Sequence, residues 1–343
     1  MRKVRLGKTG LMVTKTSFGA LPIQRVSFDE AARLLRRAYD AGVNYFDTAN
    51  AYTDSEEKIG YALADVRDKI IISTKTSMED LDTVRRNLDL SLRRMKTDYI
   101  DIYQLHNPAE LPSDEIYDFL LQAKKAGKIR HIGITNHRPG VARAAIESGL
   151  FETLQFPFCL LSGETETELV RLCAERDIGF IAMKAISGGL ISNARAAFAF
   201  LDRYPNVVPI YGVQRMEELE EWLALEQNPP EDNAEIETAI AQQRRDLGGD
   251  FCRGCGYCMP CPAGIEIWTA ARISFLIGRA PYENYLSDEW RDKMNLIENC
   301  IGCGHCKQHC PYGLDTPALL RRELARYRKL YEELKVRDAD IRK

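Results

Sequence analysis

The sequence predicts an α/β fold in which a (β/α)8 barrel of the TIM type is followed by a smaller cysteine-rich domain. Over residues 15–225, eight apolar strand-like segments alternate with eight amphipathic helical segments, and this alternation is typical of parallel α/β folds. No GxGxxG run occurs early in the chain, which favours a barrel over an open dinucleotide-binding sheet. Further along, eight cysteines fall in two tight runs between residues 252 and 310, a usage that indicates metal ligation rather than disulfides in a cytosolic context.

A strand–helix rhythm accounts for the first part of the chain. Residues 1–14 alternate apolar and polar side chains around Gly7 and Gly10, which predicts a small β-hairpin before the barrel. The predicted strands are residues 15–21, 43–47, 70–74, 99–105, 129–134, 153–156, 180–183 and 207–211. The predicted helices, whose apolar side chains recur every three or four positions, are residues 29–41, 55–64, 81–95, 114–126, 141–147, 166–176, 194–203 and 216–225.

The remaining chain divides into further parts. Pro229 and Pro230 end the eighth helix, so we predict a barrel at residues 1–227 and a linker with a helix at residues 228–250. The linker helix, residues 233–247, is polar but periodic. At a rise of about 22 Å it could return the chain from the bottom of the barrel to its catalytic top. A cysteine-rich domain at residues 251–320 and a charged helix at residues 321–343 follow.

Composition limits the classes of partner. The formal net charge of −3 gives no general reason to expect nucleic acid or an anionic membrane. No apolar run approaches the roughly 20 residues that span a bilayer, and the first residues lack the apolar core of a signal peptide. We therefore expect a cytoplasmic protein that acts on a small molecule.

Four residues with acid–base chemistry lie at or just after the ends of consecutive predicted strands: Asp47, Tyr52, Lys75 and His106. If these strands are neighbours in a barrel, the four side chains converge on one face. A phenol has a pKa near 10 and needs a neighbour that favours the phenolate, which the ammonium of Lys75 would supply. Asp47 would hold Lys75 by an ion pair, and His106 would orient a substrate oxygen. Each residue alone is equally compatible with a cap, a turn or simple packing.

Several motifs also carry a resemblance. FDTANAY followed by Ser55 and Glu56, STK, YQLH, GKIRHIGITNH and IAMKAISGG occur in an order that resembles the aldo/keto reductase family over residues 1–225. The resemblance implies an NADPH- or NADH-dependent oxidoreductase that interconverts a carbonyl and an alcohol by hydride transfer. It assigns Tyr52 as general acid and base, Lys75 and Asp47 as residues that tune it, and His106 as the residue that orients the carbonyl.

The same resemblance implies a set of coenzyme contacts. Thr135, Asn136 and Gln155 would hold the nicotinamide carboxamide, and Met183 takes the place of a stacking aromatic ring. The loops after the seventh and eighth strands would hold the phosphates, as in many such barrels. The candidates there are Lys184, Gly188, Gly212, Gln214 and Arg215.

The residues expected around the adenosine phosphate depart from the family pattern. Gly212, Glu218 and Trp222 stand where NADP-selective members have Lys, Arg and Asn. A carboxylate at Glu218 would repel a 2′-phosphate, whereas Arg215 or Lys184 could compensate. The choice between NADH and NADPH therefore stays open.

The two cysteine runs predict two 4Fe–4S clusters. They read C-x2-C-x2-C-x2-C-P and C-x2-C-x2-C-x3-C-P, a pattern similar to that of bacterial two-cluster ferredoxins, in which the fourth cysteine of each run binds the other cluster. The first predicted ligand set is Cys252, Cys255, Cys258 and Cys310, and the second is Cys300, Cys303, Cys306 and Cys261. Paired zinc sites are the alternative, but they would leave the third cysteine and the Cys-Pro ending without a purpose.

Other features of the cysteine-rich part are less specific. Residues 267–279 are amphipathic and are expected to pack this domain onto itself or the barrel. His305 and His309 are expected at the surface, and Cys159 and Cys173 as packing thiols.

The predicted clusters have three candidate roles: an electron path to a partner protein, a redox sensor, or a structural staple. Two rival functions follow, a redox-regulated nucleotide-binding protein and an electron-transfer protein whose barrel is only a scaffold.

Overall fold

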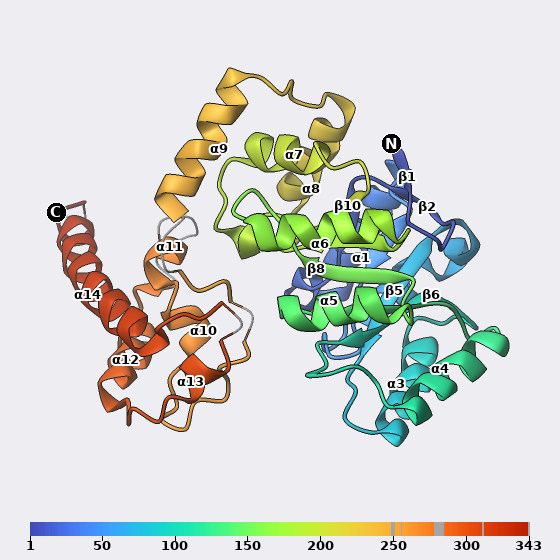
Figure 1. Ribbon diagram of the computed structural model, residues 1–343. Helices are drawn as coiled ribbons and strands as arrows, with labels where there is room; N and C mark the ends of the chain where they lie inside the picture. Colours follow the sequence, from blue (N-terminus) through green and yellow to red (C-terminus); the bar gives the residue numbers. More distant parts are fainter. Residues whose placement is uncertain (248–250, 255, 278–284, 311, 342–343) are drawn as a thin grey trace. The chain divides into compact units, whose positions relative to one another are not determined.

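A computed structural model describes residues 1–247, 251–254, 256–277, 285–310 and 312–341 (Figure 1). Cys255 and the glycines predicted to end the linker helix lie outside the described residues. The chain forms two compact units. The barrel unit contains Met1–Ile186 and Asn193–Ala241, and the second unit contains Ser187–Ser192 and Gln242–Lys343.

The barrel unit confirms the predicted (β/α)8 architecture. Eight strands, all parallel, close into a barrel in which sequence neighbours pair and the last strand pairs with the first. The strands are β3 (Ser17–Gly19), β4 (Tyr45–Asp47), β5 (Ile71–Thr76), β6 (Ile100–His106), β7 (Ile129–Thr135), β8 (Thr153–Pro157), β9 (Gly179–Met183) and β10 (Val207–Gly212). Because all strands run the same way, their carboxyl ends meet at one rim.

Eight helices cover the barrel (Figure 1). They are α1 (Phe28–Asp40), α2 (Ser55–Leu63), α3 (Leu81–Arg94), α4 (Asp114–Lys125), α5 (Pro139–Ser148), α6 (Glu164–Glu175), α7 (Ala194–Asp202) and α8 (Met216–Gln227). At α1, α3, α4 and α7, a side chain at the start of the helix satisfies a backbone N–H group that has no partner within the helix. Ser27 and Glu30 form a reciprocal capping box at α1, and Asp80 caps α3.

The predicted N-terminal hairpin closes the bottom of the barrel. Strands β1 (Lys3–Arg5) and β2 (Met12–Thr14) pair antiparallel, and Leu6 and Val13 pack among barrel-interior side chains. The turn at Gly7 has φ +52°, and a Cβ there would lie 2.2 Å from the backbone nitrogen of Gly179. Arg2 binds the buried carboxylate of Glu226 in α8, with 2.8 Å between the backbone nitrogen and Oε1. The first and last elements of the barrel are thereby fastened to each other.

Helix α9 (Ala234–Leu247) is the predicted linker helix, and four short helices and one long helix follow it among the described residues of the second unit. These are α10 (Ile267–Ala270), α11 (Ile273–Ile277), α12 (Asp288–Asn295), α13 (His305–Gln308) and α14 (Thr316–Ile341). The amphipathic stretch at residues 267–279 contains the two short helices α10 and α11, and residues 278–279 lie outside the described parts. Ile267, Ile273 and Ile277 join the core of the second unit itself.

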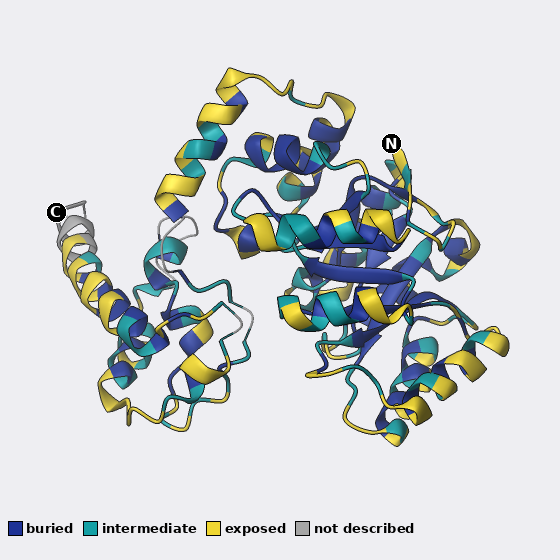
Figure 2. Cartoon of the chain, in the orientation of Figure 1, coloured by how far each residue is buried: buried dark blue, intermediate teal, exposed yellow. Residues whose placement is uncertain are grey.

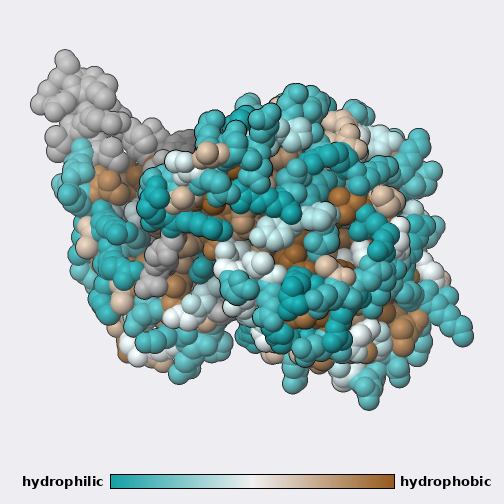
Figure 3. All heavy atoms as spheres, turned by 45° about the horizontal axis from the view of Figure 1, so that its top comes forward, coloured by the Kyte–Doolittle hydropathy of each residue, from teal (hydrophilic) through white to brown (hydrophobic). Residues whose placement is uncertain are grey.

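Between Thr316 and Glu333, buried and exposed residues alternate along α14 (Thr316–Ile341), and the buried apolar ones join that core (Figure 2). On the face seen in Figure 3, hydrophilic side chains dominate and apolar ones form scattered patches. Among the described residues, no helix has both the length and the apolar character needed to cross a membrane.

Candidate active site

The four predicted acid–base residues lie together at the carboxyl ends of β4, β5 and β6. Asp47 is the last residue of β4, Lys75 lies in β5 and His106 ends β6. Tyr52 lies in the loop that leaves β4. The Lys75 ammonium is 5.3 Å from the centroid of the Tyr52 ring, and the Tyr52 and His106 rings meet edge to face at 5.8 Å. Neighbouring parallel strands bring these side chains together, as the strand-end argument predicts.

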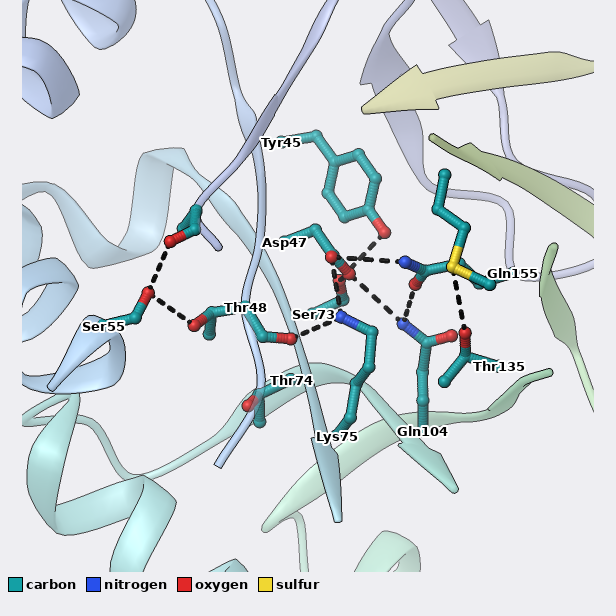
Figure 4. A network of polar contacts seen from close by, with 12 residues as sticks. Tyr45, Asp47, Thr48, Ser55, Ser73, Thr74, Lys75, Gln104, Thr135 and Gln155 are labelled. Carbon is teal, nitrogen blue, oxygen red and sulfur yellow. Dashed lines mark hydrogen bonds and ion pairs between the residues drawn. The ribbon is translucent and has the colours of Figure 1, made fainter. Parts of the chain in front are cut away.

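A buried ion pair forms the base of the site (Figure 4). Lys75 Nζ donates to Asp47 Oδ2 at 2.7 Å and to the carbonyl oxygen of Thr48 at 2.6 Å. The side chains of Lys75 and Asp47 are 1% and 3% exposed. Burial lowers the pKa of Lys75, and the adjacent Asp47 carboxylate opposes that effect. The pair satisfies two charges that would be costly to bury separately.

The pKa of the Tyr52 phenol is shifted in the direction opposite to the sequence-based expectation. Burial raises the pKa of Tyr52 above its ordinary value, and the negative charge of Asp47 raises it further. The phenolate was expected to be favoured by Lys75, but the ammonium is already bound to Asp47 and Thr48. Tyr52 is therefore a phenol at neutral pH, the protonation state that a general acid requires.

His106 is held in its neutral form. Burial lowers the pKa of His106 to about 3, and the Lys75 charge acts in the same direction. A neutral imidazole can donate a hydrogen bond to a substrate oxygen without giving up a proton at physiological pH. The site therefore contains one group suited to donate a proton and another suited to orient the acceptor.

A polar network that the sequence analysis did not identify supports Asp47 (Figure 4). Ser73 Oγ donates to Asp47 Oδ1 at 2.5 Å, and Gln104 Nε2 donates to Gln155 Oε1 at 2.8 Å. Gln104 and Gln155 also reach the Asp47 carboxylate at 3.4 and 3.3 Å. The sequence offered a partial signal, since Ser73 and Gln104 lie in predicted strands shortly before the candidate residues Lys75 and His106.

The predicted carboxamide contacts lie at the ends of β7, β8 and β9. Thr135 Oγ1 contacts the sulfur of Met183 at 3.8 Å, close to Gln155 (Figure 4). The Asn136 side chain instead donates to the carbonyl oxygen of Pro108 and accepts from the backbone N–H of Arg138, both at 2.8 Å. Thr135, Gln155 and Met183 thus form a group, whereas the Asn136 amide is engaged by backbone.

The predicted phosphate contacts are arranged around Glu218. Its carboxylate accepts from the backbone N–H groups of Gln214 and Arg215 at 2.8 and 3.1 Å. It also pairs with the Arg215 guanidinium at 2.8 Å. The start of α8 and the Arg215 guanidinium are therefore both bound to the Glu218 carboxylate. Arg215 was expected to offset the repulsion between Glu218 and a 2′-phosphate, but here its charge is already paired.

The other residues named for this region lie nearby in the chain. Gly212 ends β10, and Lys184 follows β9 with φ +60°. Trp222 is buried and stacks on Tyr211, with ring centroids 4.0 Å apart. Gly188 belongs to Ser187–Ser192, a segment of the second unit.

The predicted cluster cysteines line two pockets of the second unit. One is lined by Cys261 together with Cys300, Cys303 and Cys306, and Cys258 reaches it as well. The other is lined by Cys252, Cys258 and Cys310, with Cys306 on its wall. The fourth cysteine of each run thus lies with the other run, as the predicted crossing requires.

Each pocket is lined by cysteines of both runs, which is the arrangement that crossed cluster ligand sets need. The Gly254 N–H also donates to Cys252 Sγ at 3.3 Å, the kind of contact that tunes cluster potentials.

The remaining cysteines and histidines have other surroundings. Cys159 and Cys173 are buried in the barrel unit, and burial raises the pKa of the Cys173 thiol, so both behave as packing residues. His305 is partly buried and lines the first pocket, and His309 is exposed and stacks on it.

Comparisons with known sequences agree with both parts of the chain. Residues 14–199 match the sequence model of the aldo/keto reductase family, and residues 251–315 match that of the 4Fe-4S dicluster domain. The uncharacterized oxidoreductase YqkF of Bacillus subtilis is 30% identical over 207 residues, which cover 56% of this chain and 67% of that protein.

Solved structures of aldo-keto reductases have the same fold as the barrel unit of this chain. Aldo-keto reductase AKR11C1 from Bacillus halodurans, in its holo form, superposes with a TM-score of 0.63 at 23% identity, covering 71% of this chain and 96% of its own. An aldo-keto reductase from Klebsiella pneumoniae in complex with NADPH superposes with a TM-score of 0.62 at 23% identity, and the match covers 71% of this chain and 94% of that protein.

Proposed function

Because this chain belongs to the aldo/keto reductase family and carries a 4Fe-4S dicluster domain, we propose that it reduces a small-molecule carbonyl to an alcohol, or the reverse, through Tyr52. The observation that carries the proposal is the buried Asp47–Lys75 pair beside Tyr52 and His106 at one end of the barrel. A binding protein would not require this combination of side chains.

Tyr52 is the proposed proton donor. A bound nicotinamide coenzyme supplies the hydride that reduces the carbonyl carbon. As negative charge develops on the carbonyl oxygen, Tyr52 transfers its phenolic proton to that oxygen and becomes a phenolate. The phenolate forms beside the Lys75 ammonium, 5.3 Å from the ring centroid, whose charge is balanced by Asp47, so the phenolate is short-lived and readily takes up a proton again. In alcohol oxidation the same groups act in reverse.

His106 is the proposed orienting residue. Its pKa of about 3 keeps the imidazole neutral at physiological pH, so it donates a hydrogen bond to the carbonyl oxygen and does not compete with Tyr52 as the acid. This division of roles supports a single proton-transfer route.

For the coenzyme, we assign the nicotinamide end to Thr135, Gln155 and Met183, which lie next to the Asp47 network. Asn136 would join them only after exchanging its backbone partners. At the phosphate end, Glu218 favours NADH, because its carboxylate would repel a 2′-phosphate near the start of α8. The Klebsiella pneumoniae reductase binds NADPH, so both coenzymes belong in the test.

We further assign one 4Fe–4S cluster to Cys252, Cys255, Cys258 and Cys310, and a second to Cys300, Cys303, Cys306 and Cys261. The two cysteine-lined pockets support both sets, with Cys255 outside the described residues. Such clusters carry one electron at a time, which suits exchange with a partner protein.

The test is an anaerobic titration with NADH and NADPH, with and without a panel of carbonyls, on wild type, Tyr52→Phe and Tyr61→Phe. Tyr61 is a matched control because it is 53% exposed on α2. Loss of a general acid should lower kcat by about 100-fold or more in Tyr52→Phe, with Tyr61→Phe unchanged. Full carbonyl reduction by Tyr52→Phe would reject the assignment, and cluster reduction by nucleotide alone would favour the scaffold alternative.

A further inference from the structure

The second unit exposes part of one cysteine run beside a surface pocket. Cys300 and Cys303 are exposed, and Ile301 between them is 70% exposed. A separate pocket is lined by Cys300 and by residues of α14 that include Arg321 and Arg328. We refer to it as the Cys300 pocket.

The Cys300 pocket shares a wall with the cysteine-lined pocket of the second run. Cys300, Pro317 and Leu320 line both. A group seated in the Cys300 pocket would thus lie about one side chain away from a cluster held by that run. Electron transfer weakens steeply with distance, so this is a favourable place for electrons to enter or leave.

The neighbouring face of α14 is positively charged. Between Thr316 and Tyr331 this helix carries five basic residues: Arg321, Arg322, Arg326, Arg328 and Lys329. Its one acidic residue in that range, Glu323, is buried and bound to Ser274 and Arg326. Arg321 and Arg328 are seven positions apart, which places them on one stripe of the helix.

Arg328 forms an ion pair, but the pair is exposed and weak, so the stripe formed by Arg321 and Arg328 can still attract an acidic partner. Arg328 pairs with Glu298 at 2.9 Å, and the two side chains are 49% and 59% exposed. Such exposed pairs are worth about 0–1 kcal/mol, so an incoming carboxylate can replace Glu298 at little cost.

We propose that the Cys300 pocket and the basic stripe of α14 form the docking surface for an acidic one-electron carrier protein. The proposal rests on the assignment of a cluster to Cys261, Cys300, Cys303 and Cys306. One electron leaves the reduced cluster and enters the oxidised carrier, and no bond or proton is exchanged. Exposed Ile301 beside the charged side chains of Arg321 and Arg328 matches the apolar centre and polar rim of protein interfaces, and the basic stripe selects an acidic partner.

The experiment compares two haem proteins of opposite charge, acidic cytochrome b5 and basic cytochrome c. The cluster-loaded protein is reduced with dithionite, desalted and mixed anaerobically with each oxidised cytochrome. The test variant is Arg321→Glu/Arg328→Glu. The control is Arg85→Glu/Lys125→Glu, on exposed positions of α3 and α4, which changes the net charge equally. Titration calorimetry of the oxidised proteins measures binding independently of electron transfer.

At low ionic strength, we expect the second-order rate constant with cytochrome b5 to fall at least tenfold in the test variant and less than twofold in the control. The dissociation constant should rise by a similar factor, the rate with cytochrome c should increase, and salt should remove these differences. Arg321→Gln/Arg328→Gln, expected to lose about threefold, replaces the charge reversal if that variant folds poorly.

Equal losses in test and control variants, or no loss in either, would overturn the proposal, as would preferential binding of duplex DNA to the stripe. Protein that takes up no cluster would overturn it together with the cluster assignment. Failure of carbonyl reduction would not affect it, because dithionite supplies the electrons.

Discussion

Replacing Lys75 with Met tests how far the buried ion pair stabilises the catalytic end of the barrel. Lys75 and Asp47 are 1% and 3% exposed, with 2.7 Å between Nζ and Oδ2. Removing one partner of a buried pair costs about 3–5 kcal/mol, because the other charge is left uncompensated. Asp47 would keep its hydrogen bonds from Ser73, Gln104 and Gln155. We therefore expect Lys75→Met to lower the free energy of unfolding by about 3 kcal/mol, the lower end of that range.

The assay is anaerobic urea unfolding of the wild type, Lys75→Met, Asp47→Asn and the double variant. With both charges gone, the double variant should recover about 2 kcal/mol relative to the sum of the single losses. Lys124→Met is the control, since its pair with Glu152 is 38% and 17% exposed and should cost less than about 1 kcal/mol. Additive losses in the double variant, or equal losses in Lys75→Met and Lys124→Met, would refute the reasoning.

Three further predictions concern His106, Glu218 and the crossing of the cysteine runs. Because burial lowers the pKa of His106 from 6.5 to about 3, the stability present above pH 6.5 is lost as the pH falls. Between pH 8 and 5.5 this effect lowers the unfolding free energy of the wild type by about 1.4 kcal/mol. In His106→Gln the decrease over the same range should be smaller by that amount, and parallel pH curves for the two proteins would contradict this. Glu218→Gln should raise the ratio of kcat/KM for NADPH to that for NADH about fivefold, since a charge near a partly hydrated phosphate is worth about 1 kcal/mol; an unchanged ratio, or an equal change in Glu217→Gln, would argue against it. Cys261→Ser and Cys303→Ser should leave the same remaining cluster signal by EPR, and Cys310→Ser a different one; a match between Cys261→Ser and Cys310→Ser would exclude the proposed ligand sets.

The sequence predicted the barrel and the convergence of the acid–base residues because both follow from local patterns. Alternating strand and helix segments leave few topologies, and parallel neighbours bring strand ends together. The positions of Asp47, Lys75 and His106 on one rim therefore follow from the strand pattern alone. The hairpin was equally accessible, because its alternation is local.

Features that depend on competition between contacts were not predictable in the same way. Whether the Lys75 charge acts on Tyr52 depends on how strongly Asp47 and Thr48 already hold it, which spacing alone does not reveal. Likewise, Glu218 could be identified as a carboxylate near a phosphate site, but not as the cap of its own helix. Helix α12 was not predicted, because its apolar residues are few in a charged segment.

The fastening of the first barrel elements to the last has a consequence for synthesis on the ribosome. Strand β3 completes its pairing only with β10, where Ser17 lies opposite Ile210, and Arg2 binds Glu226. Until that stretch has emerged, the growing chain carries two open sheet edges, at β3 and β9, which invite wrong pairing with other chains. The cysteine runs are translated only afterwards. The order of the chain thus lets the barrel close before the cysteines that we assign to the clusters leave the ribosome.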